Sequence, residues 1–251
     1  MQLARTQRGF TLTEMAVVFA IVALLIAGAM STLSSQVERR DTEETQRRLN
    51  AAADAVVAFA IVNRRLPCPG TASGDEALAS GTTATGGACT SNYGGFLPGR
   101  AIGFQPVDGS GYALDAWGNR IRYAVANTIT NCTGSSTTPH FTSVANLKAN
   151  GVSCQPNDLD ICAPVDTTIA CTAANRVVST STVAVIIFST GKNGALPTQG
   201  PHEAANTDGN ASFISHPQAG PDSATGRYDD LMVWLPVGVI YSKLIAAGVL
   251  P

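Results

Sequence analysis

The sequence predicts an α+β protein: a long N-terminal α-helix, followed by a loop-rich head that is built on an antiparallel sheet and stapled by disulfides. Three observations lead to this prediction. The first is an uncharged apolar stretch from Met15 to Val37, and the second is helical spacing of apolar residues that continues to Asn63. The third is a change of composition after Arg64, where turn-forming residues separate short apolar runs and all six cysteines occur.

The first half of the helix has the properties of a membrane span. Arg5 and Arg8 make the start of the chain basic, which favours the cytoplasmic side for this end. At about 1.5 Å per residue, the stretch from Met15 to Val37 is long enough to cross a hydrocarbon core of roughly 30 Å. Ordinary secretory signals have a shorter apolar region, about 7 to 15 residues. Taken alone, the segment predicts an uncleaved signal anchor.

The second half of the helix has a charged part and an apolar part. Residues 38–48 carry many charges of both signs at i,i+4 spacing, which supports a solvated helix. An apolar stripe then predicts packing against the head, and Pro67 ends the helix. The stripe consists of Leu49, Ala52, Ala53, Val56 and Ala60.

Glu14 is the residue that a simple signal anchor does not explain. A carboxylate beside an apolar membrane segment costs several kcal/mol unless another group pairs with it. The stretch Gly9–Glu14 (GFTLTE), with basic residues before it and an apolar helix after it, resembles the processing motif of type IV prepilins and type II secretion pseudopilins. This resemblance implies that a prepilin peptidase cuts after Gly9 and N-methylates Phe10. It also implies that Glu14 pairs with the terminal amine of a neighbouring subunit during assembly.

The resemblance divides the chain into a leader (1–9), a transmembrane and assembly helix (10–65) and a globular pilin-like head (66–251). It implies a structural subunit of a type IV pilus or a secretion pseudopilus, with prepilin peptidase and other pilin subunits as partners. The expected location is the inner membrane, crossed once with the head in the periplasm, and then a periplasmic or extracellular filament. The large head keeps an alternative open, namely a minor pilin at a filament tip that acts as an adhesin or as a substrate- or DNA-binding module.

The cysteines predict disulfides rather than a metal site. No CxxC pair occurs, and the three histidines have no ligand-like spacing from the cysteines. An even number of cysteines suits an exported protein, so we expect three disulfides and no free thiol. Six cysteines allow about fifteen pairings, and the sequence does not choose among them. The cysteines are Cys68, Cys89, Cys132, Cys154, Cys162 and Cys171.

The head contains few regular elements in this prediction. Strands are expected at 121–126, 177–189 and 231–235, and a short helix at 237–247, with Gly248 as its stop. The apolar face of that helix comprises Val237, Ile240, Tyr241, Leu244 and Ile245. Residues 128–174 have four cysteines and few apolar runs, which predicts a disulfide-stapled insertion made of loops.

The stretch 115–123 (DAWGNRIRY) partly resembles a turn that leads into a strand of major pseudopilins, with Ala116 and Arg120 in place of prolines. Gly118 and Asn119 suit the tight turn. Trp117 is expected to be a core anchor. This second resemblance favours the pseudopilin side of the superfamily.

Calcium is the one cofactor that the resemblance suggests. Major pseudopilins hold calcium between a glycine-rich turn after a late strand and a pair of acidic residues. This sequence has the turn 191–194 (GKNG) and, later, Asp229 and Asp230, whose carboxylates suit a hard cation. Alternatively, the two aspartates cap turns or pair with Arg227. No cofactor is certain from the sequence.

Other function classes have little support. The net charge is -2, so a broad basic face for nucleic acid is not expected outside the tip alternative. Ser189 and Lys192 satisfy an S-x-x-K pattern, but Ser189 ends an apolar strand, whereas the serine of acyl enzymes begins a helix. No phosphate-binding or dinucleotide-binding fingerprint occurs. We therefore predict that the chain is not an enzyme.

Overall fold

The computed structural model describes residues 11–130, 132, 138–194 and 199–250, and for residues 28–34 it describes the backbone only. The contacts divide the chain into two compact units, Met1–Glu43 and Glu44–Pro251. One helix, α1 (Leu12–Asn63), runs through both units without a break. The predicted long helix is therefore confirmed over its described length.

Among the described residues, no helix combines the length and the apolar character required for a membrane span. Phe10, the expected first residue of the long helix, lies outside the described residues. The apolar side chains from Leu12 to Ile26 that the structure describes are exposed in the single chain.

The core of the second unit lies between α1 and a four-stranded antiparallel sheet. The sheet has the order β1 (Gly95–Phe96), β2 (Arg122–Val125), β7 (Val183–Ser189) and β9 (Leu231–Pro236). Strand β7 is buried along its whole length, as a central strand covered on both faces must be. The predicted stripe is confirmed as the contact face of α1, with Leu49, Ala52, Val56 and Ala60 buried in the same core.

Polar contacts also attach α1 to the head. Arg48 donates hydrogen bonds to the backbone oxygens of Asp115 at 2.6 Å and Leu114 at 3.3 Å. Thr45 Oγ1 accepts a hydrogen bond from the nitrogen of Ala116 at 3.1 Å. The turn at 114–116 is therefore attached to α1 at Thr45 and Arg48.

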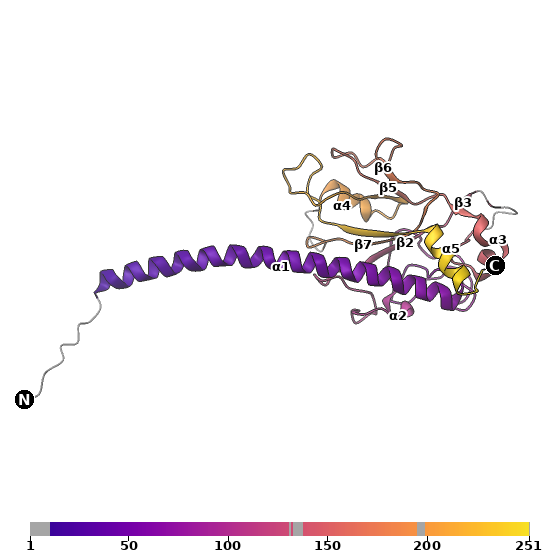
Figure 1. Cartoon of the computed structure of the whole chain (residues 1–251), viewed down its shortest axis with the longest axis horizontal. Helices are drawn as coiled ribbons and strands as arrows, with labels where there is room; N and C mark the ends of the chain where they lie inside the picture. The colour runs from indigo at the N-terminus through magenta and orange to yellow at the C-terminus, as the bar shows by residue number, and fades with distance from the viewer. Residues whose placement is uncertain (1–10, 131, 133–137, 195–198, 251) are drawn as a thin grey trace, which may run out of the picture. The chain divides into compact units, whose positions relative to one another are not determined.

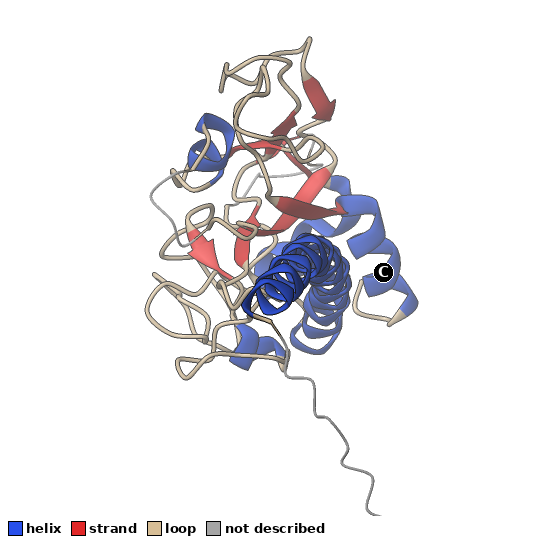
Figure 2. Ribbon diagram, turned by 90° about the vertical axis from the view of Figure 1, so that its left-hand side faces the viewer, coloured by secondary structure: helices blue, strands red, loops and turns tan. Residues whose placement is uncertain are grey.

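A second layer covers the sheet on the side away from α1 (Figure 1). It contains the strands β6 (Arg176–Val178), β5 (Asp160–Cys162) and β8 (Ser212–Ile214) in that order, with β5 and β8 parallel. The helix α4 (Pro201–Asn206) packs against β8. Figure 2, a view turned by 90°, also shows this layer on the far side of the sheet from α1.

The remaining elements are short. They are α2 (Gly99–Ile102), β3 (Ile129–Thr130), α3 (Val144–Asn150), η1 (Gly151–Ser153), β4 (Gln155–Pro156) and α5 (Val237–Ala246). The predicted C-terminal helix is confirmed as α5, with Ile240, Tyr241 and Leu244 in the core. Ile245, expected on the same face, is 46% exposed.

The prediction of one strand over 177–189 is wrong. A turn closed by a 2.9 Å hydrogen bond from Thr182 N to Ser179 O separates β6 from β7, and the two strands belong to different sheets. The interpretation of 128–174 as loops alone is also wrong. This region contains α3 and β3 to β5, and it contributes Phe141, Leu147 and Leu159 to the core.

Trp117 does not act as the expected core anchor, because it is only partly buried. The anchor of that turn is Asp115, which is 1% exposed. Its Oδ1 accepts hydrogen bonds from the backbone nitrogens of Trp117 and Asn119, at 3.0 and 2.8 Å. Gly118 has a φ of 84°, which confirms the predicted glycine turn.

The three expected disulfides are present, and none of the cysteines that the structure describes is free. Each cysteine pairs with the next one along the chain. The pairs are Cys68–Cys89, Cys132–Cys154 and Cys162–Cys171. This pairing closes three separate loops, so each bond restricts one local segment of the unfolded chain.

Candidate functional site

Two parts of the chain contain the predicted functional residues. The first is the N-terminal motif, of which Gly9 and Phe10 lie outside the described residues. Glu14 is described and stands in the first turn of α1. Its Oε2 accepts hydrogen bonds from the backbone nitrogen and the hydroxyl of Thr11, both at 2.8 Å.

This contact is reciprocal, because the backbone nitrogen of Glu14 donates to Thr11 Oγ1 at 3.3 Å. A threonine and a glutamate three residues apart that exchange hydrogen bonds form a capping box, which stabilises a helix start. The T-x-x-E spacing is visible in the sequence and signals this role. Glu14 is exposed, and its Oε1 has no hydrogen-bond partner among the described residues.

The second part is an acidic cluster in the head, composed of the buried Glu203 and Asp230 and the partly buried Asp229. Their carboxylates all lie within 4.8 Å of one another. Asp229 and Asp230 directly precede β9, and Glu203 lies on α4. The contact of α4 with the residues that precede β9 therefore adds a third acid to the two predicted ones.

The glycine-rich turn at 191–194 lies against this cluster. Gly191 has a φ of 64°, a left-handed conformation that side chains disfavour. A Cβ at Gly191 would overlap the Asp229 carboxylate, so this position has no room for a side chain. The structure thus brings together the two ends of the predicted calcium loop.

Hydrogen bonds hold Glu203 in place. Asn193 Nδ2 donates to both of its carboxylate oxygens, at 3.2 and 3.0 Å. The backbone nitrogens of Gly200 and Asp229 donate to Oε2 and Oε1, at 2.6 and 2.8 Å. On the other side, Asn206 Nδ2 donates to Asp230 Oδ2 at 2.8 Å.

Several oxygens of the cluster have no partner although they are buried. They are Asn193 Oδ1, Asp229 Oδ1 and Asp230 Oδ1. Burial and the neighbouring Glu203 carboxylate raise the pKa of Asp229 to about 6. Burial, together with Glu203 and Asp229, raises the pKa of Asp230 to about 8, even though the Asn206 hydrogen bond opposes the rise. Arg227 acts to lower the pKa of Asp229 and Arg122 that of Asp230, but neither offsets the rise, so the described residues leave these negative charges undercompensated.

The donor set fits a hard divalent cation. Calcium binds six to eight oxygen ligands from carboxylates, amides and backbone carbonyls. Three carboxylates and the free oxygen of Asn193, which is 3% exposed, supply oxygen ligands without sulfur or nitrogen. Sequence reasoning found Asp229 and Asp230 but missed Glu203 and Asn193, although the 191–194 turn that it singled out contains Asn193.

The alternative role as a turn cap is supported for Asp229, because a backbone hydrogen bond from Asn193 acts to lower the pKa of its carboxyl group. No hydrogen bond or ion pair between Arg227 and either aspartate occurs among the described residues, although Arg227 lies close enough to lower the pKa of Asp229. Ser189, the serine of the S-x-x-K pattern, is buried, and its hydroxyl donates to Asp115 Oδ2.

The N-terminal segment indicates which class of protein this chain resembles. A long N-terminal helix that packs its second half on an antiparallel-sheet head is the architecture expected for pilin-like subunits. Comparison with protein families matches the prokaryotic N-terminal methylation motif to residues 4–30, a segment that does not include the head. No curated protein and no solved structure matches the chain. The chain thus carries the cleavage and methylation signal of type IV pilins and pseudopilins, and this signal supports a pilin-like or pseudopilin-like protein.

Proposed function

We propose that this protein is a structural subunit of a type IV pilus or a type II secretion pseudopilus. The methylation motif at residues 4–30 is the observation that carries the proposal. Prepilin peptidase removes residues 1–9 and methylates the new terminus, Phe10. Residues 10–65 then serve as the anchoring and assembly helix, and residues 66–251 as the head. The protein begins in the inner membrane and continues in a filament with other subunits.

The exposed apolar side chains of α1 support the assembly role. Leu12, Phe19, Leu24 and Leu25 are each at least 65% exposed in the single chain. Surface of this kind needs lipid or other helices around it, since large exposed apolar patches mark interaction sites. A membrane covers it before assembly, and the helices of neighbouring subunits cover it in a filament.

Glu14 fits the proposed docking step. Its Oε2 is engaged by Thr11, whereas Oε1 is available for a second group. Cleavage after Gly9 creates an ammonium at Phe10. In a low-dielectric bundle of helices, an unpaired carboxylate is strongly penalised, so a pairing with the ammonium of a neighbouring subunit selects one axial register.

Mass spectrometry of the protein purified from its native membrane tests the proposal. The expected mature chain begins at N-methylated Phe10, and a Gly9→Leu variant stays at full length because the added side chain blocks the peptidase site. A native protein that keeps Met1 and Gly9 would contradict the proposal. Equal processing of the wild type and the Gly9→Leu variant would show that another protease acts.

We further propose that the acidic cluster binds calcium and thereby stabilises the head. The three unpartnered buried oxygens and the two raised pKa values support this proposal. The ion would neutralise Glu203, Asp229 and Asp230 and hold the glycine-rich turn, α4 and the start of β9 together. This role is structural.

A further inference from the structure

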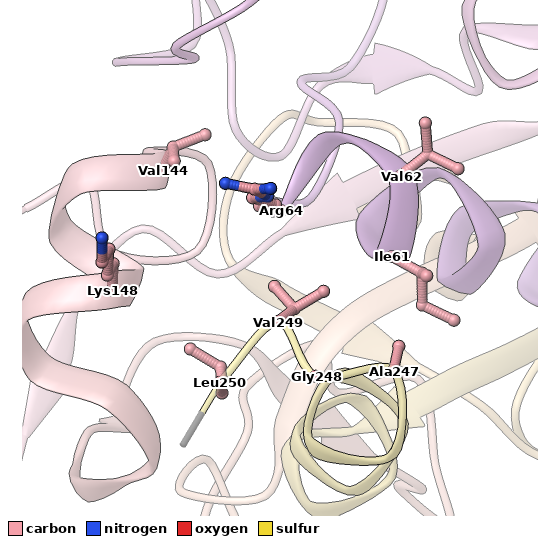
Figure 3. Close-up of a pocket in the computed structure, with 9 residues that line it drawn as sticks. All are labelled: Ile61, Val62, Arg64, Val144, Lys148, Ala247, Gly248, Val249 and Leu250. Atoms are coloured by element: carbon pink, nitrogen blue, oxygen red, sulfur yellow. The ribbon is translucent and has the colours of Figure 1, made fainter.

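A pocket of about 410 Å³ lies where the end of α1, the helix α3 and the segment after α5 meet (Figure 3). Its walls are partly apolar. Ile61 comes from α1, Val144 from α3, and Val249 and Leu250 from the C-terminal segment. Small-molecule sites typically have volumes of about 300 to 1,000 Å³, so this pocket has room for a small ligand.

Two cations line the same pocket. Arg64 follows the last residue of α1, and Lys148 stands near the end of α3. Figure 3 shows the Arg64 side chain extending towards α3, which carries Lys148. Neither side chain has a hydrogen-bond or ion-pair partner within the described part of the chain, and the described lining of the pocket contains no acidic residue.

The neighbouring Arg65, unlike Arg64, has an acidic partner. It is fully buried, and its two terminal nitrogens contact the Glu76 carboxylate at 2.6 and 2.7 Å. The fold therefore neutralises one of two consecutive arginines and leaves the other exposed in the pocket. The positive charge of Arg64 has no counterpart among the described residues.

Arg64 also has an unusual backbone conformation. Its φ is 58°, and it is the one described residue other than glycine with a positive φ. Glycine is the usual residue at this position after a helix, because a Cβ is disfavoured in the left-handed conformation. Glycine would therefore adopt this backbone conformation with less strain than arginine. The feature that arginine adds is a guanidinium in the pocket.

We propose that this pocket binds a small aliphatic monocarboxylate, for which hexanoate is a suitable probe. The guanidinium of Arg64 and the ammonium of Lys148 bind the carboxylate, because charge-assisted hydrogen bonds to a carboxylate are strong and directional. The side chains of Ile61, Val144 and Val249 contact the aliphatic chain. The site is independent of the calcium cluster and of the proposed filament role.

Calorimetric titration of the purified full-length protein with hexanoate tests this inference, with the same detergent in cell and syringe. Saturable binding at one site is expected. Hexylammonium has the same chain and the opposite charge, so it should not bind. Acetate carries the charge without the chain and should bind more weakly than hexanoate.

Variants locate the site. Arg64→Gly and Lys148→Gln should each weaken hexanoate binding about tenfold, as the loss of one hydrogen bond to a charged group predicts. Arg64→Gly should leave the melting temperature unchanged or higher, because glycine suits the positive φ, so its binding defect cannot come from unfolding. Lys243→Gln, an exposed cation of α5 outside the pocket, is the matched control and should bind like the wild type.

Three results would overturn the inference. The first is an absence of saturable hexanoate binding, and the second is equal binding of hexanoate and hexylammonium. The third is equal affinity in the wild type, Arg64→Gly and Lys148→Gln, which would place any binding elsewhere on the protein.

Discussion

Glu203 accepts a hydrogen bond from the backbone nitrogen of Asp229 at 2.8 Å, which places the two carboxylates in one buried cluster although they are 26 residues apart in the sequence. The contact joins α4 to the residue pair before β9. The cluster of carboxylates is stable only if its negative charges are compensated, because like charges at this distance repel one another in a buried site. A bound cation or bound protons can supply the compensation.

Calcium is therefore expected to raise the melting temperature of the protein. Binding to the folded state stabilises it by RT ln(1 + [L]/Kd), which is about 2.7 kcal/mol at a calcium concentration of 100 Kd. Melting curves in millimolar calcium and in chelator measure the effect. Glu203→Gln and Asp230→Asn should reduce the shift, whereas Asp222→Asn, at an exposed position outside the cluster, should retain it. Coincident curves for the wild type would mean that the cluster binds no calcium.

In chelator, the stability of the protein should fall as the pH rises from about 4 to about 8. The pKa values of Asp229 and Asp230 are raised to about 6 and about 8, so the folded state holds protons that the unfolded state has released. Stability decreases with pH wherever the folded state binds more protons than the unfolded state. Urea denaturation across this pH range should show the decline, and Asp230→Asn should flatten it. A wild-type profile that rises between pH 5 and 8 would contradict the raised pKa values.

Replacement of Glu76 by Gln should destabilise the head by about 3 kcal/mol or more, because it leaves the fully buried Arg65 guanidinium without its counter-charge. Denaturant titration measures the change. The pair Arg100 and Asp75 offers a matched comparison, since both of its side chains are at least half exposed. Asp75→Asn should cost less than about 1 kcal/mol. Similar costs for the two variants would show that the buried pair contributes no more than a surface pair.

Thr11 and Glu14 allow the capping role to be separated from the docking role. Glu14→Gln keeps a side chain that can complete the capping box but removes the charge, and it should reduce incorporation into filaments. Thr11→Ala removes the cap and keeps the charge, so incorporation should persist despite a weaker helix start. Quantitative immunoblots of sheared filaments, normalised to membrane-bound protein, distinguish the two. The reverse ranking would mean that helix capping, not the charge, matters for assembly.

Peptide mapping without reduction should recover three linked pairs, each made of cysteines adjacent in sequence order. The structure closes the loops 68–89, 132–154 and 162–171, and no described cysteine is left over. Thiol labelling of the denatured, unreduced protein should accordingly be negligible. Any peptide that links the first pair to the second or third would contradict this connectivity.

Local patterns in the sequence predict much of this protein. The long helix, its apolar stripe from Leu49 to Ala60 and the C-terminal helix after Pro236 depend on periodicity and stop signals within a few residues, which are readable without a structure. The methylation motif is likewise contiguous. Asp229 and Asp230 stood out because they are adjacent in the chain.

Only the tertiary structure determines which distant residues meet. It pairs the cysteines, separates β6 from β7 and adds Glu203 and Asn193 to the two aspartates. It also distinguishes Arg65, buried against Glu76, from Arg64, exposed in a pocket, although the two are neighbours of the same type. The physical reason is that hydrogen-bond patterns and side-chain spacing act over one or two turns, whereas burial, pKa values and ion pairing depend on neighbours that chain folding brings from far along the sequence.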